Sequence, residues 1–174
     1  MEPPHRLRDL TTAQRWAALL VVAALLQPFA VAALRAGSVG WEAGSDDALL
    51  ALRAHDVLHG DVPLVGQPST SDLATDITTF HPGPLEMWAF APLVELFGGT
   101  GMLVGALVAN AACVLLCVWI AYRRAGPTVA VWAAALLVLV IHSTGTAMLG
   151  DPVTSNLWSY PIIAVAFCAW GLST

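Results

Sequence analysis

Acidic side chains are concentrated in one part of this 174-residue chain. Nine of the twelve Asp and Glu residues lie between Glu42 and Glu95, where Arg53 is the single Arg or Lys. Two of the acids are adjacent, Asp46 and Asp47. A carboxylate can act as a general base toward a reacting hydroxyl or amine, so this pair is the first candidate for chemistry. The rival interpretation is structural, because carboxylates are also common in the first turn of a helix.

Histidines form the second group with possible chemistry. His55 and His59 are four residues apart, which puts two imidazoles on one face of a helix at the spacing of a metal-binding pair. We favour solvated surface histidines for this pair, and we assign no metal ligands from the sequence. His81 precedes Pro82-Gly83-Pro84, a rigid segment that would either aim its imidazole at a ligand or use it for packing.

The residues around the acidic pair predict a helix over 45–60. Ser45 suits the N-cap, the two aspartates would occupy the first turn, and Gly60 suits the position just after the helix. Leucines and a valine give this helix an apolar side that can lie on a membrane surface or on other helices. A polar loop rich in Pro, Gly, Ser and Thr follows.

Composition places these elements in a membrane protein. Hydrophobic residues make up 57% of the chain and charged residues 11%, and the mean hydropathy is +0.72, which is outside the usual range of soluble domains. Four apolar runs approach the ~20 residues that a helix needs to cross a membrane. A cleaved signal peptide is the rival interpretation of the first run, but that run is long for a signal and further runs follow it.

Charge asymmetry predicts how the spans are oriented. Residues 84–97 are short and acidic for a span and suit an interfacial helix. With that segment on the surface, the N-terminal arginines and Arg123-Arg124 share one side, which the positive-inside rule assigns to the cytoplasm. We therefore expect an all-α fold, a polytopic transmembrane helical bundle whose outer-face loop contains short juxtamembrane helices.

The expected segments follow from these boundaries. They are a cytoplasmic N-terminus at 1–15, a first transmembrane helix at 16–35, an external loop at 36–100 with juxtamembrane helices at 45–60 and 84–97, a second span at 101–122, a cytoplasmic turn at 123–126, a third span at 127–147, an external loop at 148–156, and a fourth, shortened span at 157–174.

The order of these features resembles the start of the GT-C membrane glycosyltransferases. A first span is followed by Asp46-Asp47, a short helix ending in Gly-Asp, a loop, and then His81-Pro82-Gly83-Pro84-Leu85. The nearest branch contains the protein O-mannosyltransferases and the lipid A aminoarabinose transferases. In that branch the acidic pair is commonly Asp-Glu, and no Gly separates the prolines. Arg123-Arg124 resembles the basic pair that closes the next span. The resemblance covers about residues 16–150 and depends on the order of weak motifs.

The resemblance implies transfer of a sugar from a polyprenyl-phosphate donor to an acceptor at the outer face of the cell membrane. An inverting transfer of this kind needs a base but no nucleophilic residue. By that analogy Asp46 is the base, and Asp47 orients the acceptor or a cation. Arg53 and His81 are the candidates to meet the donor phosphate, and Asp151, expected on the same face, supports the acceptor or a metal. The cofactor stays open, with a divalent metal ion as one candidate.

Two alternatives stay open beside the enzyme. GT-C enzymes have more spans than this chain, so it could be a non-catalytic polytopic membrane protein, such as a transporter fragment or an assembly factor. A transporter would place ionisable groups at mid-membrane, whereas these charges cluster outside the apolar runs. The chain could also be a truncated, inactive reading frame, or the N-terminal portion of an enzyme whose other helices come from a downstream membrane polypeptide. The bilayer and the donor are the expected partners. Nucleic acid is not expected, because the net charge is −5.

Overall fold

The regular elements that the structure describes are all helices. The structure is a computed structural model that describes residues 11–67, 80, 83–152 and 157–173. Its helices are α1 (Thr12–Ser38), α2 (Asp46–Leu58), α3 (Leu85–Phe97), α4 (Thr100–Thr144), α5 (Thr146–Leu149) and α7 (Ser159–Leu172). The all-α fold class expected from the sequence is therefore confirmed for these residues.

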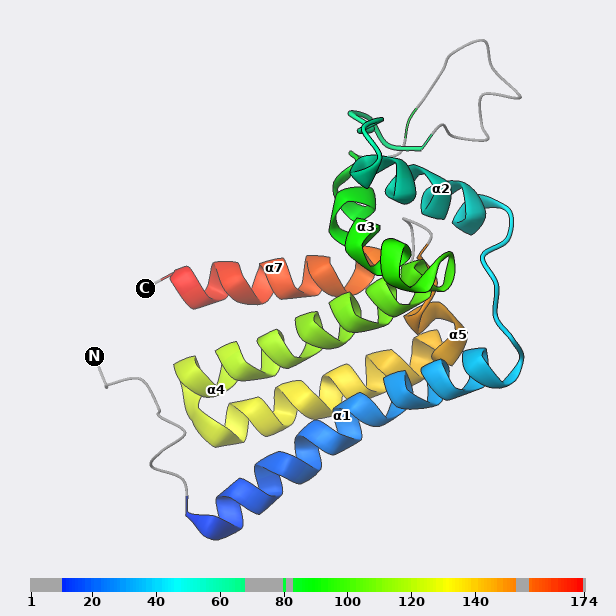
Figure 1. The fold of residues 1–174 in the computed structure, drawn as a ribbon. Coiled ribbons are helices and arrows are strands. Elements are labelled where there is room, and N and C mark those ends of the chain that lie inside the picture. Colours follow the sequence, from blue (N-terminus) through cyan, green and yellow to red (C-terminus); the bar gives the residue numbers. More distant parts are fainter. Residues whose placement is uncertain (1–10, 68–79, 81–82, 153–156, 174) are drawn as a thin grey trace.

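Helix α4 consists of two helices that meet at Gly126. This glycine has φ 83° and ψ −176°, a backbone conformation that glycine adopts without the steric cost of a Cβ. Pro127 follows, at a position where proline is well suited to begin a helix. Figure 1 shows the chain reversing at this point, so that the first half of α4 (residues 100–125) and its second half (127–144) run side by side in opposite directions. The reversal falls within residues 123–126, where the sequence predicted a turn.

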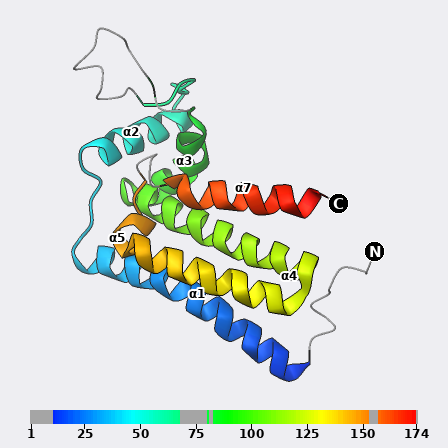
Figure 2. The ribbon, with the colours of Figure 1, turned by 180° about the vertical axis from the view of Figure 1, so that it is seen from behind.

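The long helices form a stack with a cap at one end. In both Figure 1 and Figure 2, α1, the two halves of α4 and α7 run side by side, and α2, α3 and α5 lie at the same end of the stack. The start of α1 and the end of α7 lie at the opposite end. One buried apolar cluster ties the stack together, and it includes Leu25 and Phe29 of α1, Val114 and Ile141 of α4, and Tyr160 of α7.

Among the described residues, two helices, α1 and α4, are long and apolar enough to cross a membrane. They have 27 and 45 residues, whereas α7 is apolar but has 14, fewer than the ~20 that a crossing requires. Large apolar side chains on their outer faces are exposed, including Leu20 of α1 and Leu136 of α4. Extended apolar surface of this kind is a feature of proteins that contact membranes. The helices thus indicate membrane association.

The cap is held to the stack by close packing. Leu50 and Ala54 of α2, Met87 of α3 and Met102 of α4 share a second buried cluster and are at most 1% exposed. Gly105 allows α3 to approach α4, because a Cβ at this position would lie 2.6 Å from the ring of Phe90. The helices expected at 45–60 and 84–97 are observed here as α2 and α3, and this packing gives them fixed positions at the end of the stack.

The ends of α2 differ from the expectation at one residue. Ser45 occupies the N-cap position, but its side chain makes no capping hydrogen bond and its φ is 50°. The capping role predicted for its hydroxyl is therefore wrong. At the other end, Gly60 has φ 93°, and the amide of Asp61 donates to the carbonyl of Asp56 across 3.2 Å. This is the glycine-terminated helix end that the sequence predicted.

Candidate functional site

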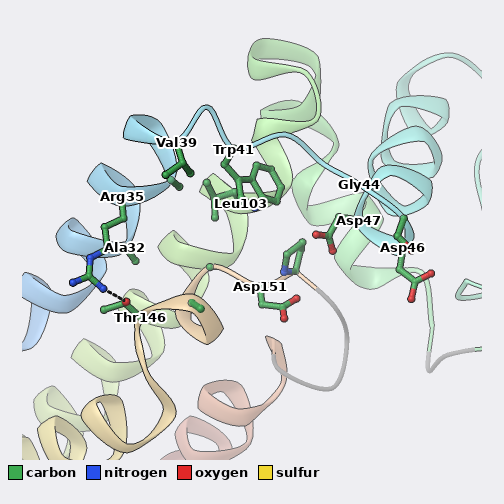
Figure 3. Close-up of a pocket in the computed structure, with 15 residues that line it drawn as sticks. Ala32, Arg35, Val39, Trp41, Gly44, Asp46, Asp47, Leu103, Thr146 and Asp151 are labelled. Carbon is green, nitrogen blue, oxygen red and sulfur yellow. Dashed lines mark hydrogen bonds between the residues drawn. The ribbon is translucent and has the colours of Figure 1, made fainter.

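A pocket of about 530 Å³ lies at the capped end of the helix stack. Residues from the end of α1, the start of α2, the first half of α4 and the segment around α5 form its walls (Figure 3). The lining residues are Ala32, Arg35, Ala36, Val39, Trp41, Gly44, Ser45, Asp46, Asp47, Leu103, Thr146, Ala147, Gly150, Asp151 and Pro152. Segments that are distant in the sequence thus meet at one hollow.

Three of the five residues expected at the site line this pocket: Asp46, Asp47 and Asp151. Figure 3 shows the carboxylates of Asp47 and Asp151 turned toward each other, whereas that of Asp46 points away from them. Arg53 does not line the pocket. It is half-buried on α2, and its Nε has no hydrogen-bond partner among the described residues. His81 lies outside the described residues.

Asp151 is positioned by the segment that follows the second half of α4. Asn110, fully buried in the first half of α4, donates from Nδ2 to the carbonyl of Leu149 across 3.0 Å. The next residue, Gly150, packs so tightly on α4 that a Cβ would lie 2.5 Å from the side chain of Leu103. A larger residue at position 150 would force the Leu103 side chain to shift, and the close contact made by Gly150 brings Asp151 to the pocket wall.

Asp47 is positioned by the first turn of α2. Its amide donates to the carbonyl of Gly44 across 3.1 Å, and Leu50, one turn later, is 1% exposed in the cap cluster. The Oδ1 atom of Asp47 is buried and has no hydrogen-bond partner among the described residues. Burying an oxygen without a hydrogen-bond partner destabilises the fold. A ligand hydroxyl or amine that donates to Oδ1 of Asp47 would remove this cost.

The surroundings of Asp47 change its acidity. Burial raises the pKa of this carboxyl above its usual value of 3.8, and the negative charges of Asp151 and then Asp46 raise it further. Desolvation and like charges both disfavour the ionised form of an acid. A carboxylate whose pKa moves upward is a stronger base, and such groups are frequent at functional sites.

Two pocket residues were not foreseen in the sequence. Arg35 lies in the last turn of α1 and donates from Nη1 to Oγ1 of Thr146 across 3.0 Å. Trp41 follows α1, and its amide donates to the carbonyl of Ala36 across 2.9 Å. Arg35 did carry a signal, because it is the first charged residue after the apolar run that begins at Trp16. A charge at the end of a span marks the boundary between lipid and water.

The three carboxylates of the pocket are not gathered into one three-ligand metal group. A metal-binding group brings its ligand atoms close together, and within the described part of the chain Asp46, Asp47 and Asp151 do not form a group in which three ligand atoms lie within 4.8 Å of one another. We therefore assign no step at this pocket to a metal.

No protein-family model, curated protein or solved structure matches this chain. Its functional interpretation accordingly depends on the chemistry of the pocket and on the sequence motifs.

Proposed function

We propose that the chain acts in a membrane glycosyltransferase of the GT-C type, and that the pocket between Asp47 and Arg35 binds a polyprenyl-phosphate sugar. The observation that carries this proposal is the composition of one pocket: it combines a carboxylate of raised pKa with a guanidinium, at the end of helices suited to a membrane. A donor of this class has a lipid tail, a phosphate and a sugar. The phosphate and the sugar have candidate partners among the residues that line the pocket, and the lipid tail would lie along the apolar helices beside it.

Asp47 is the base in this proposal, in place of Asp46. A general base must reach the acceptor and hold a proton during the reaction. Asp47 lines the pocket, its pKa is raised, and its Oδ1 has no hydrogen-bond partner among the described residues. The acceptor hydroxyl or amine attacks C1 of the sugar, and its proton passes to the Asp47 carboxylate. Asp151 faces Asp47 (Figure 3) and keeps its basicity high.

Arg35 is the partner of the leaving group. As the bond between C1 and the phosphate oxygen breaks, its electron pair stays on the phosphate, which leaves as polyprenyl phosphate. A guanidinium stabilises that charge and can bind two phosphate oxygens at once. Figure 3 shows Arg35 and Asp47 on opposite sides of the pocket, as base and leaving group must be for an inverting displacement. Trp41 offers the apolar face of its indole to the sugar ring.

The orientation belongs to the same proposal: a multi-pass protein with a cytoplasmic N-terminus and the pocket on the outer face. Arg124 supports this orientation, because its Nη2 donates to the carbonyl of Trp170 at the far end of α7. The arginine pair and the pocket are thus at opposite ends of the stack (Figure 1). Positive residues on the side away from the pocket fit the rule that cytoplasmic loops are rich in arginine.

Donor turnover tests the proposal. Membranes containing the full-length protein are incubated with radiolabelled polyprenyl-phosphate mannose in one arm and polyprenyl-phosphate arabinose in the other, and release of label from the lipid is measured. We expect release of label in one of the two arms. Asp47→Asn should lower this release by about 10²-fold or more, the range for loss of a general base. The matched variant Asp46→Asn should lower it by a smaller factor. If neither variant changes the release of label, Asp47 is not the base. If no label is released in either arm, the result counts against this class of donor.

A further inference from the structure

A cluster of three metal-ligating side chains lies on the cap, formed by His55 and His59 of α2 and Glu95 of α3. One ligand atom from each residue lies within 4.8 Å of the other two. All three side chains are exposed. The cluster is separate from the acidic pocket, because none of its members lines that pocket.

Packing between α2 and α3 fixes the backbone positions of His55, His59 and Glu95. Ala54, beside His55, is fully buried, and Val94, beside Glu95, is 5% exposed, both in the cluster that joins α2 to α3. Histidines four residues apart lie on one face of a helix, and here the two rings stack with centroids 3.9 Å apart and planes 8° apart. The carboxylate of Glu95 on α3 therefore lies beside two imidazoles that are already in contact with each other.

One imidazole is oriented for metal binding by its own helix. Nδ1 of His59 lies 2.9 Å from the carbonyl oxygen of His55. A carbonyl only accepts, so Nδ1 carries the proton, and in the neutral ring Nε2 has the free lone pair. A hydrogen bond from the second nitrogen to a carbonyl is the usual way in which a metal-binding histidine is oriented.

We propose that His55, His59 and Glu95 bind a zinc ion that links α2 to α3. Two imidazoles and one carboxylate are a common ligand set for zinc, which leaves a fourth position to water. Ligand atoms around a tetrahedral zinc ion are about 3.3 Å apart. The ligand atoms lie within 4.8 Å of one another, so binding requires rotation of the three exposed side chains. This rotation also opens the stacked imidazoles, so that both lone pairs point at one ion. The ion would add a link between α2 and α3 on the outside of their apolar contact.

Zinc titration of the full-length protein, made without a histidine tag and purified in detergent after chelator treatment, tests this site. Competition with a chromophoric chelator measures the affinity and stoichiometry. We expect one zinc ion per chain, with affinity lowered at least ~10-fold in His59→Ala and in Glu95→Gln. His142→Ala is the matched control, because Nδ1 of His142 lies 2.8 Å from the carbonyl of Val138 in the same way, yet His142 belongs to no such group of three among the described residues.

Cobalt substitution supplies a second readout that does not depend on affinity. Co²⁺ in a site with two nitrogen and one or two oxygen ligands absorbs visible light much more strongly when it is tetrahedral than when it is hydrated. We expect this absorption in the parent protein and in His142→Ala, and its loss in Glu95→Gln. Glu95→Gln changes one exposed atom, so the variant should fold. The proposal is overturned if zinc binding is not saturable, or if Glu95→Gln and His59→Ala bind zinc as the parent does.

Discussion

Asn110 in the first half of α4 donates a 3.0 Å hydrogen bond to the carbonyl of Leu149, the last residue of α5. Asn110 is fully buried within the apolar stretch that forms most of the first half of α4. A buried amide is costly unless it is hydrogen-bonded, so its presence here indicates a specific positional role. The bond holds the chain two residues before Asp151 and so links the interior of the helix stack to the wall of the pocket.

We expect Asn110→Ala to lower the free energy of unfolding by about 1–3 kcal/mol, because the Leu149 carbonyl loses its partner and a small cavity forms. Reversible denaturation in mixed micelles measures this change. Val108→Ala truncates a side chain at an exposed position on the same helix, and we expect it to change stability by less than about 0.5 kcal/mol. Equal effects of the two substitutions would contradict a special role for the Asn110 bond.

Asp47 should make stability depend on pH in a specific direction. Its pKa is raised in the folded protein, by burial and then by Asp151 and Asp46, so the folded state holds the Asp47 proton more tightly than the unfolded chain does. This contribution to stability is fully present below pH 3.8, the usual pKa of the group, and is lost as pH rises through the raised pKa. The ionised form of the Asp47 carboxylate therefore lowers the free energy of unfolding.

The consequence is that Asp47→Asn should be more stable than the parent at pH 7.5, and that this gain should shrink on acidification toward pH 4. Thermal unfolding in detergent at several pH values measures it. Asp61→Asn, at an exposed position beyond α2, is the control that should show no such gain. A variant that is more stable yet less active is typical of a functional site. An Asp47→Asn protein that is less stable at pH 7.5 would contradict the raised pKa.

Much of the helical framework was predictable because its signals are local. Apolar runs, the arginines at 123–124 and Gly126-Pro127 give the positions of the long helices and of the reversal between them, and the bounds expected for α2 and α3 lie within two residues of those observed. The role of Ser45 was not predictable in the same way. Its φ of 50° is set by the path of the chain from α1 to α2, which depends on packing between distant segments.

The site was predictable only in part, for the same physical reason. Asp46 and Asp47 are neighbours in sequence, and Asp151 joins them in one pocket, as expected for two loops on one side of the stack. The sequence favoured Asp46 as the base, whereas burial and the unsatisfied oxygen distinguish Asp47. Which of two adjacent carboxylates is buried depends on the rotation of α2 about its axis. That rotation is decided by its contacts with α3, which a short motif does not contain.

Arg35 should control binding of the donor phosphate. We expect Arg35→Gln to weaken binding of a polyprenyl monophosphate about 10-fold or more, because a hydrogen bond to a charged group contributes about 1.5–3 kcal/mol. Arg35→Lys should recover part of the loss through its charge, but not the paired geometry of the guanidinium. Titration of the protein in nanodiscs with polyprenyl monophosphate measures the affinity.

Arg53→Gln is the comparison for Arg35→Gln. The sequence suggested Arg53 for the phosphate, but its side chain does not line the pocket, so we expect little change in affinity. The opposite result, with Arg53→Gln weakening binding and Arg35→Gln leaving it intact, would place the phosphate outside the pocket.

Cysteine labelling should place the two ends of the stack on opposite sides of the membrane. The native cysteines at 113, 117 and 168 are first replaced by alanine, and single cysteines are introduced as Asp61→Cys beside the cap and Ala125→Cys at the reversal in α4, both exposed positions. In intact cells a membrane-impermeant maleimide should label the first variant, and it should label the second only after permeabilisation. The arginines beside Ala125 are the physical reason, because they favour the cytoplasmic side. Labelling of Ala125→Cys in intact cells, with Asp61→Cys protected, would put the acidic pocket in the cytoplasm, where a polyprenyl-phosphate sugar presented at the outer face could not reach it.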